Sequence, residues 1–231
     1  EPWGGGMYTL DGFSKRGISA WNDQIRNFIR VVNNVEGKQK GGLLFGGTGT
    51  IANDIKKYVS FTSSKVGGQF VERGHSVSYS ESHDNCTLGD IIRVGNGDYK
   101  INKKIESVLD MCDMSDDAVK KNPAKDKALR QNKLGALFLL TCQGAIMMQS
   151  GQEFAKSKVV AFRSDKNVDK GPKAKQGTID HDSYEKDDDT NWLDFNIAEK
   201  NISLFNYYKG LLAIRAEHPA FRDSDIKAIK F

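Results

Sequence analysis

Three carboxylates and one imidazole fall between residues 81 and 90, directly after a short β-prone run. The run, Ser76 to Ser80, alternates apolar and small polar side chains, which predicts a strand with Val77 and Tyr79 on one face. Carboxylates are costly to bury in their charged form, so their density predicts a polar site at the tip of this strand. The four groups are Glu81, His83, Asp84 and Asp90.

The same residues also allow a purely structural interpretation. Thr87 is followed three residues later by Asp90, a spacing that resembles a capping box at the start of a helix. On this interpretation the segment is a polar loop that leads into a helix. From the residues alone both interpretations stay open.

The motifs along the chain resemble those of one enzyme family. Ser-His-Asp-Asn at 82–85 is similar to the fourth conserved region of the α-amylase family of glycoside hydrolases, and Tyr-Ser-Glu-Ser-His-Asp-Asn-x-Thr-Leu at 79–88 resembles its form in pullulanases. Glu-Pro-Trp at 1–3 is similar to the third region, where a strand ends in the general acid/base Glu. Gln-Ser-Gly-Gln-Glu-Phe at 149–154 resembles the last barrel strand, and Ser-Lys at 157–158 continues it as in debranching enzymes.

The resemblance implies an α/β fold, the C-terminal half of a (β/α)8 TIM barrel from about the end of strand 5 to strand 8. This part would cover residues 1–221, and residues 222–231 would begin a following all-β domain. We expect parallel neighbouring strands whose C-terminal ends converge at one edge, where barrel active sites are built. The expected strands end at Trp3 or cover 18–21, 76–80 and 145–149, and apolar spacing predicts helices over about 25–32, 51–59, 126–141 and 202–215.

The activity implied is hydrolysis of α-1,6-glucosidic linkages in pullulan, branched dextrins, glycogen or starch, with retention of configuration. Glu1 takes the role of the general acid/base. Asp84 is the second essential carboxylate, which holds substrate hydroxyls and favours the oxocarbenium-like transition state, while His83 hydrogen-bonds the same sugar. The other expected substrate-binding residues are Trp3, Asn85, Tyr184 and Asn191.

The loop that carries Tyr184 and Asn191 resembles the Asn-Ser-Tyr to Asp-x-x-Asn-x-x-Asp-Trp segment of pullulanases. It departs from that pattern at His181-Asp182, where the family prefers Asn. Substrate contacts from this loop therefore rest on a partial match. The acidic run 187–189 either ligates calcium through its hard oxygens or is a solvated charge run.

The family's nucleophile belongs to a Gly-Phe-Arg-x-Asp-type segment before the general acid, and these 231 residues contain no such segment. We therefore expect a missing N-terminal half of the barrel to supply it, and we expect this chain alone not to hydrolyse pullulan. The alternatives are another α-glucan hydrolase or transglycosylase of the same family, or a non-catalytic carbohydrate-binding half barrel.

Composition excludes several other classes of function. The formal net charge of +4 is too mild and dispersed for a nucleic-acid surface. The longest apolar runs, 137–140 and 145–148, fall far short of the roughly 18 residues of a membrane span. The glycine-rich stretch 41–49 lacks the Lys that a phosphate-binding loop needs.

Three cysteines, Cys86, Cys112 and Cys142, show no metal-ligand spacing, and we expect them to be small buried hydrophobes. No cofactor is expected, because paired carboxylates supply the acid–base chemistry. The chain has no initiator Met and begins on what should be a strand tip, so we expect residues upstream of Glu1 and predict no cellular compartment.

Overall fold

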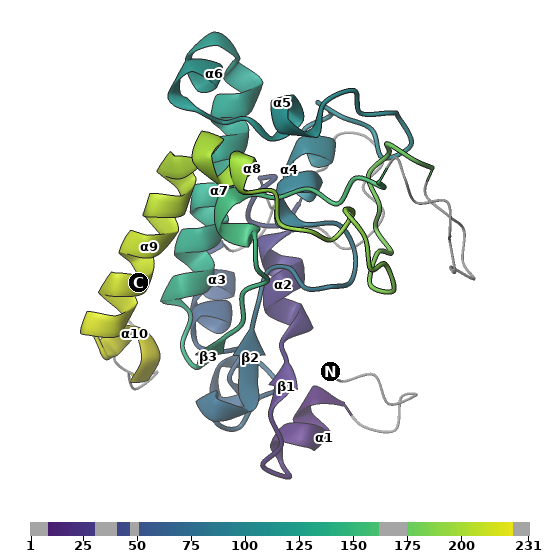
Figure 1. The fold of residues 1–231 in the computed structure, drawn as a ribbon. Helices are drawn as coiled ribbons and strands as arrows, with labels where there is room; N and C mark the ends of the chain where they lie inside the picture. Colours follow the sequence, from purple (N-terminus) through teal and green to yellow (C-terminus); the bar gives the residue numbers. More distant parts are fainter. Residues whose placement is uncertain (1–8, 31–40, 47–50, 162–174, 224–231) are drawn as a thin grey trace.

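The computed structural model describes residues 9–30, 41–46, 51–161 and 175–223. Three short strands, β1 (Ala20–Trp21), β2 (Ser76–Ser78) and β3 (Ala145–Ile146), form one sheet in that order, and both pairings are parallel (Figure 1). The predicted parallel order of these three strands is confirmed. The strand expected at Glu1–Trp3 lies outside the described residues.

Helices connect and cover the strands. Long helices follow β2 and precede β3, so the crossovers between parallel strands are helical. The α-helices are α1 (Leu10–Ser14), α2 (Asp23–Ile29), α3 (Ile51–Val59), α4 (Leu88–Gly95), α5 (Val108–Cys112), α6 (Asp116–Lys121), α7 (Pro123–Thr141), α8 (Phe195–Lys200), α9 (Ile202–Glu217) and α10 (Ala220–Asp223), and three 3-10 turns cover Ser64–Val66, Arg73–His75 and Gln152–Phe154.

The main core lies where α7 packs against α9, α4 and α2, and α7 and α9 lie side by side in Figure 1. It includes Ile29, Leu88, Leu139 and Leu204, none of which is exposed to solvent. The three cysteines are free and buried, which confirms the expectation that they pack as small hydrophobes.

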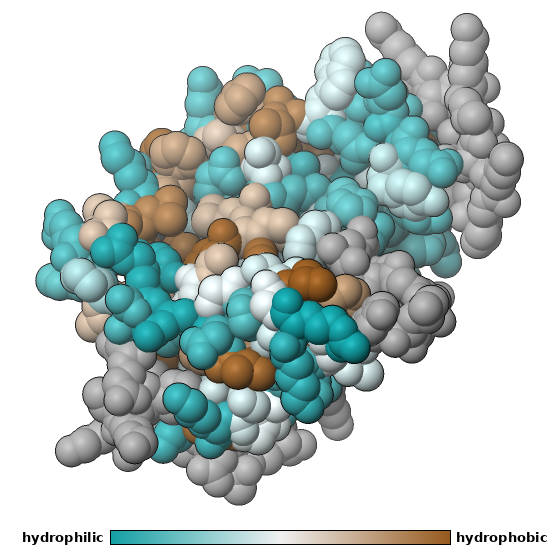
Figure 2. Space-filling view, turned by 90° about the horizontal axis from the view of Figure 1, so that it is seen from below, coloured by the Kyte–Doolittle hydropathy of each residue, from teal (hydrophilic) through white to brown (hydrophobic). Residues whose placement is uncertain are grey.

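Part of the apolar surface remains uncovered. Viewed from below, hydrophobic residues form several groups among hydrophilic ones (Figure 2). On α9, four large apolar side chains are between 37% and 53% exposed: Ile202, Phe205, Leu212 and Ile214.

The strands are shorter than predicted, and the small polar side chains of β2 are buried. Ser76, Ser78 and Ser80 are fully buried, as Tyr79 is. The physical reason is that a parallel sheet is covered on both faces, so the small polar side chains of the second face are buried as well. Ser76 is paired there, because the Asn22 amide donates a hydrogen bond to its hydroxyl at 2.8 Å.

Gly68 gives a test of the loop that leads into β2. A Cβ atom at this position would lie 1.8 Å from the carbonyl oxygen of Thr62, so the backbone would have to move. We expect Gly68→Ala to lower the free energy of unfolding by at least about 3 kcal/mol, measured by chemical denaturation. Gly74→Ala is the matched control, since nothing lies within 4 Å of its Cβ position, and its effect should stay below about 1 kcal/mol. Equal effects of the two substitutions would contradict this packing.

Candidate active site

The turn at His83 and Asp84 follows β2 and presents both side chains to solvent. The side chains are 48% and 35% exposed, and the Nε2 atom of His83 lies 3.4 Å from a carboxylate oxygen of Asp84. An imidazole and a carboxylate this close can act together on one polar ligand. Glu1, the third member of the predicted site, lies outside the described residues, so its proximity to this pair stays a prediction.

Two aromatic rings flank His83. The indole of Trp21, the last residue of β1, lies 5.7 Å from the imidazole between ring centroids. The phenol of Tyr184 comes from a distant loop and lies 6.4 Å from it, with the residue 54% exposed. The predicted site residues His83, Asp84 and Tyr184 are therefore neighbours, whereas Trp3 lies outside the described residues.

Trp21 was missed as a site residue, although the sequence held a signal for it. It ends a predicted strand parallel to the one that leads to His83, so its side chain belongs to the same edge of the sheet. Rigid aromatic side chains at such an edge combine apolar area with a polar atom, which suits the faces of sugar rings.

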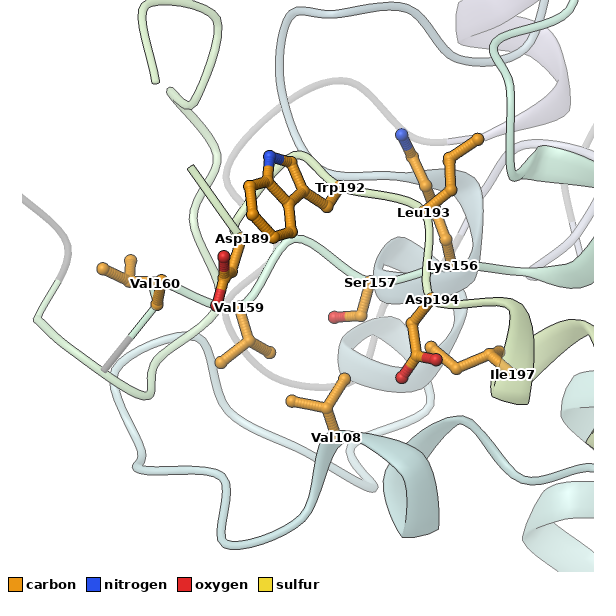
Figure 3. A pocket seen from close by; sticks show the side chains of 11 residues that line it. Val108, Lys156, Ser157, Val159, Val160, Asp189, Trp192, Leu193, Asp194 and Ile197 are labelled. Atoms are coloured by element: carbon orange, nitrogen blue, oxygen red, sulfur yellow. The ribbon is translucent and has the colours of Figure 1, made fainter. Parts of the chain in front are cut away.

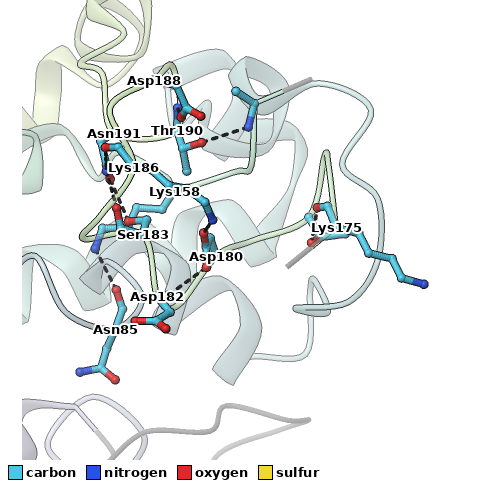
Figure 4. Close-up of polar contacts among 12 residues, drawn as sticks. Asn85, Lys158, Lys175, Asp180, Asp182, Ser183, Lys186, Asp188, Thr190 and Asn191 are labelled. Atoms are coloured by element: carbon cyan, nitrogen blue, oxygen red, sulfur yellow. Dashed lines mark hydrogen bonds and ion pairs between the residues drawn. The ribbon is translucent and has the colours of Figure 1, made fainter. Parts of the chain in front are cut away.

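Asn85 and Asn191 were predicted to bind substrate, and the structure describes the backbone of the first and the hydrogen bonds of the second. Asn85 has a left-handed backbone with φ of 63°. The amide of Asn191 donates to the carbonyl oxygens of Ser183 and Lys186 at 2.6 and 2.7 Å and accepts from the Ser183 hydroxyl at 2.8 Å (Figure 4). The Asn191 side chain thus stabilises the conformation of the loop that carries Tyr184. For Asn85 and Asn191, a direct contact with substrate stays a prediction.

Asp90 does not belong to the exposed site. The hydroxyl of Thr87 accepts a hydrogen bond from the Asp90 N–H at 3.0 Å, which caps α4. The Asp90 carboxylate is fully buried and lies 3.0 Å from the guanidinium of Arg93. The expectation that all four titratable groups form one polar site is wrong for Asp90, because this buried ion pair satisfies its charge. The capping interpretation is correct for this end of the motif.

Glu81 is buried beneath the turn. One of its carboxylate oxygens accepts a hydrogen bond from the N–H of Leu88 at 2.6 Å, and the residue is 1% exposed. Burial raises the pKa of Glu81 to about 7, although this hydrogen bond and the nearby cations Lys156 and Lys158 oppose the shift.

Asp23, the first residue of α2, contacts Tyr79 and Arg26. The side chain of Asn22 caps α2. The Asp23 carboxylate instead accepts a hydrogen bond from the hydroxyl of Tyr79 and lies 3.3 Å from the guanidinium of Arg26. Burial and this hydrogen bond raise the pKa of Tyr79. The three side chains tie α2 to the segment that follows β2.

A separate pocket of about 660 Å³ lies beside the loop at 189–194 (Figure 3). Its lining residues are Val108, Lys156, Ser157, Val159, Val160, Ala161, Asp189, Trp192, Leu193, Asp194 and Ile197. None of the predicted site residues that the structure describes lines it, so the pocket and the His83–Asp84 turn are different features.

Two kinds of feature are absent from the part of the chain that the structure describes. No group of three or more His, Cys, Asp or Glu side chains is arranged to hold a metal ion there. Within the same residues, no helix has the length and apolar character needed to cross a membrane.

Comparison with known proteins shows what the chain is similar to. No protein-family model matches the chain. Pullulanase A of Streptococcus pneumoniae is 26% identical over 92% of this chain, and the isoamylase of Pseudomonas amyloderamosa is 23% identical over 97% of it. The chain resembles pullulanases. It spans 16% of that pullulanase and 26% of that isoamylase, so it corresponds to a limited part of each.

Solved pullulanase structures share the fold of the chain. Apo pullulanase from Paenibacillus barengoltzii superposes with a TM-score of 0.66 at 24% identity, covering 95% of this chain and 27% of that one. A product complex of the glycogen-degrading pneumococcal protein SpuA also gives a TM-score of 0.66, over 94% of this chain and 22% of that one. The pullulanase resemblance inferred from the motifs is confirmed, and the α/β fold is that of one part of these structures.

The buried Glu81 of this pullulanase-like chain predicts a pH dependence. Its pKa of about 7 in the folded state exceeds its ordinary value of 4.5, so the folded state binds more protons between these pH values. The free energy of unfolding should therefore fall by about 3 kcal/mol as the pH rises from 4.5 through 7. Glu81→Gln removes this titration, so its stability relative to the unaltered protein should rise across the same window in denaturation measured at each pH.

The matched control is Glu106→Gln, because the Glu106 side chain is 84% exposed. Its stability difference from the unaltered protein should change less with pH than that of Glu81→Gln. A pH-independent difference for Glu81→Gln would show that burial does not raise the pKa of this carboxyl.

Proposed function

We propose that this chain forms part of an enzyme that hydrolyses α-1,6-glucosidic linkages in pullulan, branched dextrins, glycogen or starch. One observation carries the proposal. The imidazole of His83 lies near the exposed carboxylate of Asp84 and near the rings of Trp21 and Tyr184, beyond the carboxyl end of a parallel strand in a fold shared with pullulanases.

The proposed residue roles come from the motif resemblance, and the arrangement supports them. The carboxylate of Asp84 accepts hydrogen bonds from sugar hydroxyls and stabilises positive charge that develops on the ring, while His83 hydrogen-bonds the same sugar. Tyr184 stacks on a sugar face. Asn85 and Asn191 would add polar contacts. Substrate binding and transition-state stabilisation are thus the tasks we assign to the described residues.

Two further residues complete the proposed site from outside the described ranges. Glu1 is proposed as the general acid/base and Trp3 as a stacking residue, on the motif resemblance alone. A retaining mechanism also needs a carboxylate nucleophile about 5 to 5.5 Å from the acid/base. We propose that a preceding segment of the barrel supplies this nucleophile, and we propose no cofactor, since carboxylates perform the chemistry.

We further propose that residues 1–221 are the C-terminal half of a TIM barrel and that an all-β domain begins at 222. The chain covers at most 30% of any of the solved pullulanase chains compared here. The exposed apolar side chains on α9 support the proposal, because such a face in a larger protein is usually covered by neighbouring segments.

The experiment compares the 231-residue chain with a longer protein that contains it. The longer protein should release reducing sugar from pullulan and from branched dextrins, and release it much more slowly from linear α-1,4-linked amylose. Preferred cleavage of amylose would favour another hydrolase of the family, and formation of new glucosidic linkages would favour a transglycosylase. Glucan binding without turnover by the longer protein would identify a carbohydrate-binding half barrel instead.

A further inference from the structure

Lys158 lies directly beneath the His83–Asp84 turn. Its side chain is fully buried, and its ammonium donates a hydrogen bond to the carbonyl oxygen of His83 at 2.5 Å. It donates a second one to the carbonyl oxygen of Asn85 at 3.0 Å (Figure 4). These carbonyls belong to the residues on either side of Asp84. A single buried cation therefore holds both ends of the peptide that carries the proposed catalytic carboxylate.

The backbone of Lys158 is hydrogen-bonded to α4. Its N–H donates to the carboxylate of Asp90 at 2.9 Å, and that carboxylate is paired with the guanidinium of Arg93. The Lys158 backbone is thereby fixed to the first turn of α4, and only the side chain extends to the turn. Lys158 therefore connects α4, through its backbone, to the exposed turn at His83–Asn85, through its ammonium.

The chemistry of the contact makes it hard to replace. An ammonium has three N–H donors and no acceptor, so one group can serve two carbonyl oxygens at once. Hydrogen bonds with one charged partner are also stronger than neutral ones. Loss of the ammonium would leave two inward-facing carbonyl groups without their donor, and the turn would relax to satisfy them.

We propose that Lys158 is a positioning residue for glucan cleavage, which fixes the place of the Asp84 carboxylate by binding the carbonyl groups on both sides of it. The proposal rests on the proposed function, since it assigns Lys158 a part in that reaction. A displacement of about 1 Å at a positioned catalytic group can lower a rate about 100-fold. Lys158 does not itself touch the substrate.

The test substitutes Lys158 in the longer protein that contains this chain. Lys158→Met should lower kcat on pullulan about 100-fold and change KM less than about threefold, because the reacting group moves while the sugar-binding surface remains. Lys158→Arg, which keeps a buried donor group, should recover at least about tenfold of that loss. Hydrogen–deuterium exchange at the amides of Asp84 and Asn85 should accelerate in Lys158→Met, with exchange in α7 unchanged.

Lys156→Met is the matched control. Lys156 is also buried, and within the described residues its ammonium makes no hydrogen bond to the turn. Its kcat should stay within about threefold of the unaltered protein.

Three results would overturn the proposal: a kcat of Lys158→Met near that of the unaltered protein, an equal loss in Lys156→Met, or an equal rise of exchange in α7. If the unaltered protein does not hydrolyse pullulan, the proposed function fails, and the exchange at Asp84 and Asn85 decides separately whether Lys158 holds the turn.

Discussion

Replacing Asp84 with Asn in the longer protein should lower kcat on pullulan at least about 1,000-fold. The substitution keeps the shape of the side chain and removes the negative charge. That charge is proposed to stabilise the oxocarbenium-like transition state, and losing one such electrostatic contribution typically lowers a rate by about 10² to 10³ or more. The measurement is release of reducing sugar from pullulan, with protein stability determined in parallel.

Asp117→Asn provides the control for the loss of one negative charge. Asp117 is exposed on α6, and its substitution should leave kcat unchanged. Glucan binding by Asp84→Asn should weaken less than its turnover, since Tyr184 and His83 remain. A turnover within tenfold of the unaltered protein would show that another carboxylate performs the task we assign to Asp84.

Replacing Arg93 with Met should lower the free energy of unfolding by about 3 to 5 kcal/mol. The side chains of Arg93 and Asp90 are 4% and 0% exposed, and the second guanidinium nitrogen of Arg93 donates to the carbonyl oxygen of Ala155 at 2.6 Å. Without Arg93 the carboxylate of Asp90 stays buried with its charge uncompensated, which is the costly outcome when one partner of a buried pair is removed. Chemical denaturation measures the loss.

An exposed ion pair of similar spacing provides the matched comparison. Arg130 and Asp126 pair on the surface of α7 with side chains 75% and 36% exposed, and Arg130→Met should lower stability by less than about 1 kcal/mol. The double replacement of Asp90 and Arg93 by apolar residues should be less harmful than Arg93→Met alone. If Arg93→Met and Arg130→Met lower the free energy of unfolding equally, burial does not determine how much each ion pair contributes to stability.

The family resemblance predicted the parallel arrangement of the strands, and apolar periodicity, which is a local signal, predicted the positions of the helices. The sequence pattern overestimated the strands at 76–80 and 145–149. Tyr79 and Ser80 remain buried after β2 ends, and residues 147–149 remain partly buried after β3 ends, so the pattern continues past the paired residues. The residue at which strand pairing ends depends on contacts between segments that are distant in sequence. These contacts cannot be predicted from the local pattern of a single sequence.

Site residues that belong to a sequence motif could be predicted. Residues whose role depends on contacts between distant parts of the chain could not. His83 and Asp84 were found from the motif, and Tyr184 lies beside them as expected. Trp21 next to His83 is a contact between residues that are distant in sequence. The same holds for the hydrogen bonds of Lys158 to Asp90 and to the turn. Lys158 was noted only as part of a family pattern, because nothing local indicates that its ammonium reaches a peptide 75 residues earlier.

The turn at residues 83–86 is held almost entirely through main-chain atoms. Lys158 binds the carbonyl groups of His83 and Asn85, and Arg30 donates to that of Cys86 at 2.9 Å. Every residue type supplies the same carbonyl group, so the identity of the side chains at positions 83 and 84 is free to change while the number of residues is not. A library that varies these two positions at constant length should therefore yield proteins that fold, with turnover kept only where Asp84 is retained, whereas one inserted residue would move the carbonyl groups away from their donors.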